Sequence, residues 1–530
     1  MDSEKARQSG NFVLVLIAMV LGVLIGLMFA SHERQKGADG KLEGKVSEVM
    51  KLVESEYVDE VDADSLSERI LAAILSELDP HSTYLSARET ERTGEMMRGN
   101  FEGVGIVLHY EGDTAYVGQV LADGPSANVG LLPGDMIVTV DGDTVSGVGM
   151  ARDSVVARLR GPRGTKVEVH VQRLGKELAY TIRRGVVRHE TVTCAKMIND
   201  TTGYILLSSF SSTSHDEFHN ALVTLKGKGM KRLIFDLRGN GGGSLTSAVG
   251  IAGELLPTGS LIVYTQGAHS RRRDVKAPMG GLFTKGTVVV MVDENSASAS
   301  EVVSGALQDN DRATIVGRRT FGKGLVQTDF SLSDGSSVLL TTARYYTPSG
   351  RSIQRPYSSG TDEYYRSYLE QLLDESYADS MTVHINDSTP YYTTGGRVVY
   401  GGGGIVPDRL LAYHKDESFV YYNALANKGL INNVAFRYVQ HHAAELLKQY
   451  PDAKSFGKGF KASGAMLEDL IREGESKGVE RNDKSMATQR PLMMAMLKAY
   501  IGLALFGNDA FYDAYLPMDE DLREIINMKL

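Results

Sequence analysis

Three serines alternate with small residues in a segment that joins an expected strand to an expected helix. Ser296, Ser298 and Ser300 lie in residues 295–301, just after the apolar run 288–292. A hydroxyl at a strand-to-helix turn lies beside backbone N–H groups without helical acceptors, and such groups can stabilise an oxyanion. Serine is also a preferred N-cap residue, so this segment alone fits a helix cap as well as a nucleophile. Spacing does not decide which serine would act.

A lysine and a glutamine four residues apart form a second chemical element. If residues 323–332 form a strand, alternation places Lys323, Leu325 and Gln327 on one face. Burial lowers the pKa of a lysine because it disfavours the ammonium form, and a neutral lysine can take a proton from serine. The glutamine carbonyl can hold the amine in place. The alternative is an exposed lysine on an edge strand, where it would oppose aggregation.

The third element is a glycine-rich turn at residues 236–244, between the expected strand 232–237 and a helix. Backbone N–H groups in such a turn can bind an anion, either a tetrahedral oxyanion or a phosphate. A tight turn with Ser244 as helix cap is the alternative. The glycines do not form a dinucleotide fingerprint, because Ser244 occupies the last glycine position.

Two further motifs point to other chemistry but are incomplete. Residues 317–324 nearly match a P-loop, yet Gly324 stands where Ser or Thr should hold magnesium, so nucleotide hydrolysis is a weak alternative. Ser455 and Lys458 match the Ser-x-x-Lys pattern of penicillin-recognising enzymes, but the partner motifs of that class are missing. Chance explains this second match better than function does.

Composition excludes several classes of protein. The 530 residues carry a net charge of −9 without a basic stripe, which argues against a nucleic-acid partner. The single cysteine, Cys194, lies in an expected strand and excludes an intrachain disulfide and a Cys-x-x-Cys zinc site. His441, His442 and Glu445 fit a solvated helix face better than a metal site. No metal or other cofactor is therefore predicted.

Residues 12–30 are uncharged and mostly apolar, and 19 such residues are long enough to cross a bilayer as a helix. A cleaved signal peptide would have a shorter apolar region and a small-x-small site, and residues 28–31 make a poor site. We therefore predict an uncleaved single-pass anchor after a short tail, residues 1–11. Positive charges lie on both sides of the segment, so charge does not set its orientation.

The rest of the chain changes pattern in four stages. Residues 31–90 have helical periodicity, and residues 91–187 have short apolar runs split by glycine turns. Residues 188–415 alternate strand and helix and include a long strand pair, which predicts an α/β core with a mixed sheet and a β-hairpin. The polar, tyrosine-rich residues 357–392 are predicted to be an insertion. Residues 416–530 form a helical extension.

These motifs, in this order, resemble those of the C-terminal processing peptidases, also called tail-specific proteases, over roughly residues 40–410. The resemblance is carried by the segments 78–85, 236–243 and 296–301. In that family the middle serine is the nucleophile, the base follows 25 residues later and a third member four residues after it. The resemblance therefore implies the catalytic residues Ser298, Lys323 and Gln327. It also implies oxyanion donors at the N–H groups of Ala299 and Gly242.

The same resemblance implies a PDZ domain within residues 91–187. Residues 101–106 resemble its carboxylate-binding loop, and 124–127 and 132–137 resemble its later turns. A PDZ domain adds an extended peptide to a sheet edge and captures its free C-terminus with backbone N–H groups. The implied ligands are Gly103, Val104, Gly105 and Ile106, and the implied substrates are proteins or peptides with free C-termini.

The family implies a serine endopeptidase that forms an acyl-enzyme, anchored in a bacterial inner membrane with its catalytic region in the periplasm. Asp309, eleven residues after Ser298, matches an acidic family position, and we interpret it as structural. The resemblance weakens beyond residue 410, and the extension is open to self-assembly, adaptor contact or gating. The main rival is a membrane-tethered PDZ scaffold without catalysis, although a scaffold needs none of the three catalytic residues.

Overall fold

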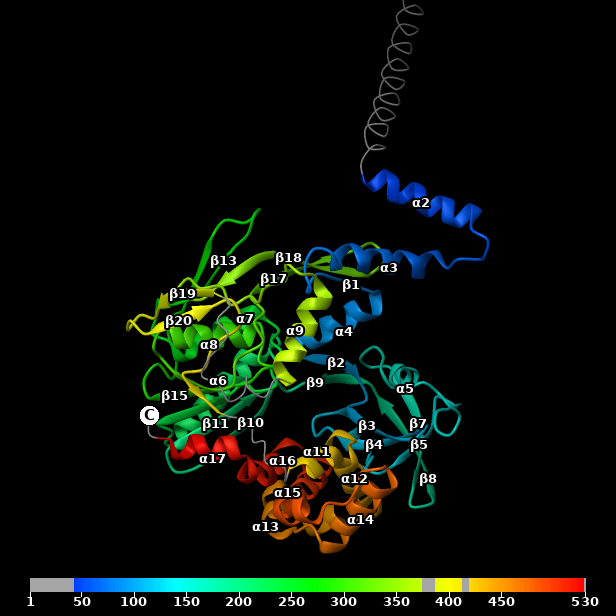
Figure 1. Ribbon diagram of the computed structural model, residues 1–530. Coiled ribbons are helices and arrows are strands. Elements are labelled where there is room, and N and C mark those ends of the chain that lie inside the picture. Colours follow the sequence, from blue (N-terminus) through cyan, green and yellow to red (C-terminus); the bar gives the residue numbers. More distant parts are fainter. Residues whose placement is uncertain (1–41, 374–386, 412–418, 529–530) are drawn as a thin grey trace, which may run out of the picture. The chain divides into compact units, whose positions relative to one another are not determined.

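The computed structural model describes residues 42–373, 387–411 and 419–528 (Figure 1). The chain divides into two compact units, Met1–Leu75 and Ser76–Leu530. The predicted anchor, residues 12–30, lies outside the described residues. None of the helices within the three described ranges combines the length and the hydropathy needed to span a bilayer.

The first unit contains α2 (Leu42–Glu56) and nearly all of α3 (Ala63–Ser76). Both helices lie within the stretch 31–90, where helical periodicity predicts them. The helical pattern ends at residues 78–85, and within that segment the structure forms strand β1 (Thr83–Leu85) of the second unit, which the sequence did not predict. This strand pairs with β18 (Ser337–Tyr346) far along the chain, so a partner that local periodicity cannot reveal decides its conformation.

The centre of the second unit is a six-stranded sheet in the order β10-β11-β12-β15-β16-β21. All neighbours are parallel except β10 and β11, which makes the sheet mixed as predicted. Its strands are β10 (Val192–Met197), β11 (Thr202–Leu207), β12 (Arg232–Asp236), β15 (Thr287–Val292), β16 (Thr314–Gly317) and β21 (Arg409–Leu410). The central strands β12 and β15 are mostly apolar and buried because both faces of the sheet are covered there.

Helices cover the two faces of this sheet from different parts of the chain. One face packs against α6 (Ser214–Gly227), α7 (Leu245–Leu255) and α8 (Ala299–Asp309) in one continuous apolar core. The opposite face packs against α17 (Glu520–Asn527), the last helix, whose Leu522 and Ile525 are buried there. Figure 1 shows α17, in red, across the sheet from α8. The end of the predicted extension therefore completes the core, which helical periodicity alone did not indicate.

A second sheet carries the predicted hairpin. Its order is β1-β18-β13-β14, with β17 paired to β18. The strands β17 (Leu325–Ser331) and β18 match the predicted pair at 324–332 and 336–346, and β13 (Leu261–Gln266) and β14 (Arg273–Lys276) complete the sheet. The predicted insertion contains α9 (Thr361–Leu373) and β19 (Asp387–Tyr392), which pairs with β20 (Val398–Gly401).

The glycine-rich segment folds as a separate β sheet with its own apolar core. β3 lies at one edge of this sheet, bonded to β4. The strands are β3 (Ile106–Glu111), β4 (Thr114–Val120), β5 (Met136–Val140), β6 (Asp143–Thr144), β7 (Lys166–Arg173) and β8 (Lys176–Arg183). The remaining elements are α4 (Ala87–Arg98), η1 (Pro125–Asn128), α5 (Arg152–Leu159) and the strand pair β2 (Asn100–Gly103) and β9 (Gly185–Arg188).

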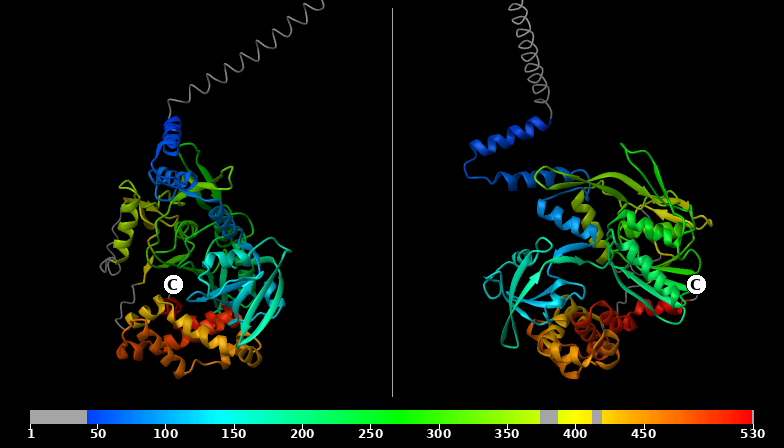
Figure 2. Two further views of the ribbon diagram at one scale, coloured as in Figure 1. Left: turned by 90° about the vertical axis from the view of Figure 1, so that its right-hand side faces the viewer. Right: turned by 180° about the vertical axis from the view of Figure 1, so that it is seen from behind.

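The C-terminal extension is helical, as predicted, and has an apolar core of its own. Figure 2 shows its helices, in orange, beside the strands β3 and β4 in both views. Its helices are α11 (Phe419–Asn427), α12 (Leu430–Gln449), α13 (Ala453–Gly459), α14 (Gly464–Ser476), α15 (Asp483–Phe506), α16 (Asn508–Tyr515), η2 (Leu516–Met518) and α17.

Candidate active site

Ser298 is the N-cap residue of α8 and has a strained backbone, with φ 54° and ψ −109°. A positive φ is uncommon for a residue with a Cβ atom, and residues in such sparsely populated regions cluster at functional sites at a cost of about 1–3 kcal/mol. The residue is partly exposed, and it forms a capping box with Glu301, whose carboxylate accepts from the N–H of Ser298 at 2.8 Å.

The two neighbouring serines are fully buried and their hydroxyls are engaged. Ser296 Oγ donates to the carbonyl oxygen of Leu237 at 2.8 Å, and Ser300 Oγ donates to that of Asn240 at 2.8 Å. Both bonds tie the serine segment to the glycine turn. The ambiguity among three serines, which spacing left open, is thereby reduced, because the hydroxyls of Ser296 and Ser300 are both committed to the glycine turn.

Glu301 joins the serine segment to the lysine segment. Its Oε2 accepts from the backbone N–H groups of Ser298 at 2.8 Å and Lys323 at 2.9 Å. Its Oε1 accepts from the N–H of Gly322 at 2.7 Å and from Thr320 Oγ1 at 2.6 Å. Burial raises the pKa of Glu301 to about 7, although these hydrogen bonds act in the opposite direction. Sequence analysis missed this residue; the available signal was a glutamate three positions after an N-cap serine.

Tyr345 makes a second link between the two segments. Its buried hydroxyl lies 3.1 Å from the carbonyl oxygen of Ser298 and within hydrogen-bond distance of that of Lys323. Glu301 and Tyr345 thus each contact the main chain at both predicted catalytic positions. The structure brings Ser298 and Lys323 into one cluster, although 25 residues separate them in sequence.

Lys323 Nζ donates to Gln327 Oε1 at 2.8 Å, so the predicted pair is in contact. The predicted geometry is wrong in detail. β17 begins only at Leu325 and its register shifts between Val326 and Gln327, which interrupts the simple alternation from 323 to 327. Burial lowers the pKa of Lys323, while the charges of Asp79 and Glu301 raise it by less. The net effect of burial and these charges is a lowered pKa, so the amine of Lys323 loses its proton more readily than that of a free lysine.

The segment before β1 packs against this pair. Gln327 Nε2 donates to the carbonyl oxygen of His81, and Asp79 accepts from the N–H of His81 at 2.8 Å and from Ser82 Oγ at 2.6 Å. Burial and the charge of Lys323 lower the pKa of His81 to about 4, so this imidazole is neutral at neutral pH. Sequence analysis quoted this segment only as part of a resemblance; its contact with Gln327 depends on the fold.

The glycine turn lies against the serine. A Cβ atom at Gly242 would lie 2.8 Å from Ser298 Cβ and 3.0 Å from the nitrogen of Ala299, so only glycine fits there. The N–H of Ala299 is the first of α8 and has no intrahelical acceptor. The N–H of Gly242, however, donates to Asn240 Oδ1 at 2.9 Å. Of the two predicted oxyanion donors, the one in the glycine turn is thus engaged within that turn.

The predicted carboxylate-binding loop lies away from the catalytic residues in sequence, between β2 and the edge strand β3. The carbonyl oxygen of Val104 accepts from the N–H of Ser126 at 2.9 Å and from its hydroxyl at 2.6 Å. Gly105 has φ 77°, and a Cβ atom there would lie 2.7 Å from the α-carbon of Gly124. The loop from Gly103 to Ile106 is therefore held tightly at the start of an edge to which a peptide can add.

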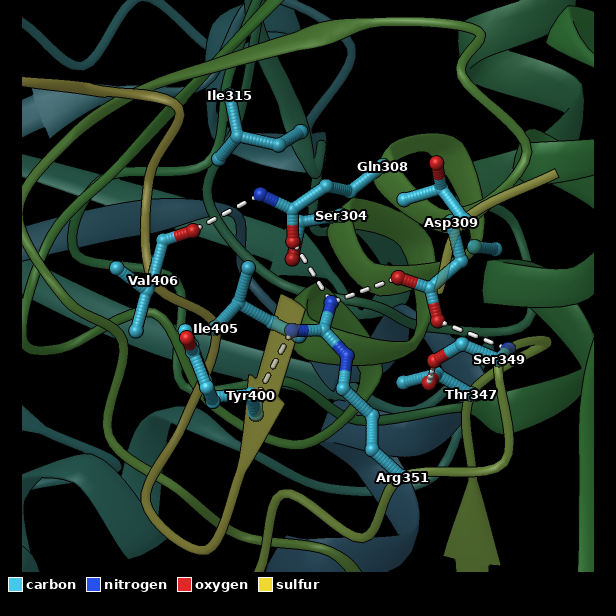
Figure 3. A network of polar contacts seen from close by, with 12 residues as sticks. Ser304, Gln308, Asp309, Ile315, Thr347, Ser349, Arg351, Tyr400, Ile405 and Val406 are labelled. Atoms are coloured by element: carbon cyan, nitrogen blue, oxygen red, sulfur yellow. Dashed lines mark hydrogen bonds and ion pairs between the residues drawn. The ribbon is translucent and has the colours of Figure 1, made fainter. Parts of the chain in front are cut away.

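A second polar network lies at the other end of α8 (Figure 3). Arg351 is fully buried and donates to Asp309 at 2.8 Å and to Gln308 Oε1 at 2.7 Å. It also donates to the carbonyl oxygen of Tyr400 at 2.9 Å, and Asp309 accepts from the N–H of Ser349 at 3.1 Å. Asp309, predicted to be structural, thus anchors α8 to the segment 349–351 and, through Arg351, to β20. Among the described residues, no three His, Cys, Asp or Glu side chains converge as a metal site.

Comparison with known proteins agrees with this geometry. The family model described as Peptidase family S41 matches residues 201–362, and the PDZ domain model matches residues 95–172. The Carboxy-terminal-processing protease of Bartonella bacilliformis is 35% identical over 319 residues, covering 58% of this chain and 72% of the relative. The chain belongs to peptidase family S41. It is a serine-type peptidase of the carboxy-terminal processing group, with a PDZ domain and a mixed α/β core.

A second relative of this S41 peptidase supports the family. Carboxy-terminal processing protease CtpA of Bacillus subtilis is 31% identical, covering 66% of this chain and 76% of the relative. Among solved structures, the photosystem II D1 C-terminal processing protease is 31% identical, with a TM-score of 0.34, covering 60% of this chain and 86% of that one. Residues 421–507, in the extension, match a family of unknown function, DUF8443.

Proposed function

We propose that this S41 peptidase cleaves peptide bonds through Ser298 as nucleophile and Lys323 as general base. Neutral Lys323 accepts the hydroxyl proton while Ser298 attacks the carbonyl, and the proton then passes to the leaving amine. Lys323 next activates a water molecule that hydrolyses the acyl-enzyme. The contact between Lys323 Nζ and Gln327 Oε1 is the observation that carries this proposal, because it holds the amine in one orientation.

The oxyanion would be stabilised by the N–H of Ala299 and by the glycine turn. Ala299 supplies the first amide of α8, where the helix dipole also favours negative charge. Gly242 is the second donor in this proposal, and its N–H exchanges Asn240 for the oxyanion when substrate binds. Its backbone contact with Ser298 supports this assignment, since no side chain separates the two.

Substrates would be proteins or peptides whose free C-terminus binds the loop from Gly103 to Ile106 and extends along β3. The same proposal places the catalytic region in the bacterial periplasm, tethered to the inner membrane by residues 12–30. The apolar composition of that segment supports the tether. Treatment of intact spheroplasts with an external protease tests this location: periplasmic exposure predicts degradation without lysis, and resistance until lysis would contradict it.

Replacement of either catalytic residue tests the mechanism. Ser298→Ala and Lys323→Ala should each reduce cleavage of an unstructured protein such as casein by at least about 10³-fold, because the nucleophile or its base is gone. Circular dichroism should show retained folding. Ser455→Ala is the matched control, since Ser455 belongs to the incomplete Ser-x-x-Lys motif in α13. Robust turnover by Lys323→Ala, or inactivation by Ser455→Ala, would contradict the proposal.

A further inference from the structure

The edge strand β3 sets the direction of any tail that binds it. A tail whose carboxylate lies at residues 103–106 must run antiparallel to β3, because that loop precedes Ile106, where the strand begins. The strand has six residues, and each paired residue advances about 3.4 Å, so about six tail residues occupy it. The seventh residue and those before it must leave the strand beyond Glu111.

A pocket of about 830 Å³ lies at that exit, within the range of about 300–1,000 Å³ that ligand pockets occupy. One wall is the end of the β3–β4 hairpin, including Tyr110 and Glu111, and the others come from α12 and α14 of the extension. Tyr110 is shared by the strand edge and the pocket. Its hydroxyl donates to the carbonyl oxygen of Arg152 in α5 at 3.4 Å, so this one residue contacts both the pocket and the helix beside the tail groove.

The extension is held to β3 on the opposite side of that strand from α5. The ring of His109 stacks on Phe436 of α12 with centroids 3.9 Å apart. Arg437 of α12 forms ion pairs with Glu111, at 3.7 Å, and with Glu473 of α14. The pocket is therefore formed before any ligand arrives. Its charged lining suits an extended polar segment rather than an apolar anchor, and it carries both signs: Arg437, Arg472 and Lys477 with Glu111, Asp469 and Glu473.

We propose that this upstream pocket, formed by Tyr110, Glu111, α12 and α14, binds the polar substrate segment that precedes the recognised tail. The inference rests on the proposed capture of the tail by the PDZ domain. It gives a function to the part of the extension that matches a family of unknown function, since α12 and α14 lie within residues 421–507. The extension thereby becomes part of the substrate-recognition surface, and selection extends upstream of the residues that pair with β3.

Peptides of two lengths test this proposal on the full chain carrying Ser298→Ala, which prevents cleavage. The probes are a six-residue peptide ending in valine with a free carboxylate, and a twelve-residue peptide with the same last six residues and a polar first half. Fluorescence anisotropy should show about tenfold tighter binding of the longer peptide, which corresponds to about 1.4 kcal/mol of added contact. Equal affinities would overturn the upstream pocket.

Two tryptophan variants test whether the tighter binding of the longer peptide arises in the pocket. Ser476→Trp fills the pocket from the exposed end of α14 and should remove the tenfold gain while six-residue binding is retained. Glu475→Trp is the matched control, because Glu475 is equally exposed on the same helix but does not line the pocket. An undiminished gain in Ser476→Trp would also overturn the proposal. If an amidated six-residue peptide binds as well as the free acid, the capture of the C-terminus itself is wrong, which is a separate failure.

Discussion

The two ends of α8 each bury a carboxylate, and they do so in different ways. At the N-terminal end Glu301 accepts four hydrogen bonds from three backbone N–H groups and a threonine hydroxyl, and burial raises its pKa to about 7. At the C-terminal end Asp309 is paired with the fully buried Arg351. One helix, buried along its whole length, thus has a neutral set of donors at one end and an ion pair at the other.

The difference matches what each end has to do. Neutral donors fix the main chain around Ser298 and Lys323 without placing a further charged side chain beside the lysine. An ion pair between fully buried partners holds α8 to the segment at Ser349 and to β20 at Tyr400, at the end of the helix away from Ser298. We infer that the N-terminal end governs rate and the C-terminal end governs stability. Variants at each end can break or sharpen this division.

The largest effect is expected at the C-terminal end. Arg351→Met should lower the free energy of unfolding by about 3–5 kcal/mol, because it leaves Asp309 buried without its cation. Denaturant titration measures the loss, and kcat per folded molecule should stay near the wild-type value. The double variant Arg351→Met with Asp309→Leu removes both charges and should recover part of the stability. A loss of kcat without a loss of stability would contradict the division between the two ends.

A smaller, mixed effect is expected at Glu301. In Glu301→Gln the amide NH₂ must face two of the four donors, which costs about 1–3 kcal/mol for the groups left unpaired. Because these donors include the N–H groups of Ser298 and Lys323, kcat should fall, by up to about a hundredfold if the whole cost appears in the transition state. Steady-state kinetics together with thermal unfolding separate the two contributions. A stable variant with wild-type kcat would show that Glu301 does not position the pair.

Much of this fold could be predicted because the buried central strands are mostly apolar. The runs 232–237 and 288–292 predicted β12 and β15 to within one residue, and the hairpin was equally clear. The pairing of β1 with β18 and the packing of α17 on the sheet could not be predicted. Each depends on a partner far along the chain, which local periodicity does not encode.

The candidate site divides in the same way. Family spacing selected Ser298, Lys323 and Gln327, whereas the contacts that hold them come from Glu301 and Tyr345 through backbone atoms, which leave little trace in sequence. The hydrogen bond from the Gly242 N–H to Asn240 also depends on the turn geometry. Contacts between side chains and backbone atoms are therefore the part of a site that only the structure reveals.

The pH dependence of the N-terminal end sharpens the comparison further. Since burial lowers the pKa of Lys323, the neutral amine is present at lower pH than in a free lysine. kcat/KM should therefore fall as the pH drops below this lowered pKa, by about tenfold per pH unit for a single essential base. Lys323→Arg is the control, because arginine stays protonated and should be inactive at every pH. If Lys323→Arg kept some activity and that activity fell at low pH as in the wild type, the acid limb would belong to a group other than Lys323.

The smallest effect is expected at Gln327. Gln327→Ala removes the acceptor of the Lys323 amine and a donor to His81, and a net hydrogen bond contributes about 0.5–1.5 kcal/mol, which is about two- to tenfold in rate. The loss should appear in kcat more than in KM, because the amine is misoriented while tail binding at the PDZ domain is untouched. Gln327→Glu keeps the acceptor and adds a negative charge, so its acid limb should move to higher pH. If Gln327→Ala instead raised KM alone, Gln327 would act in substrate binding. Only Ser298 and Lys323 would then remain as residues through which the N-terminal end of α8 governs the rate.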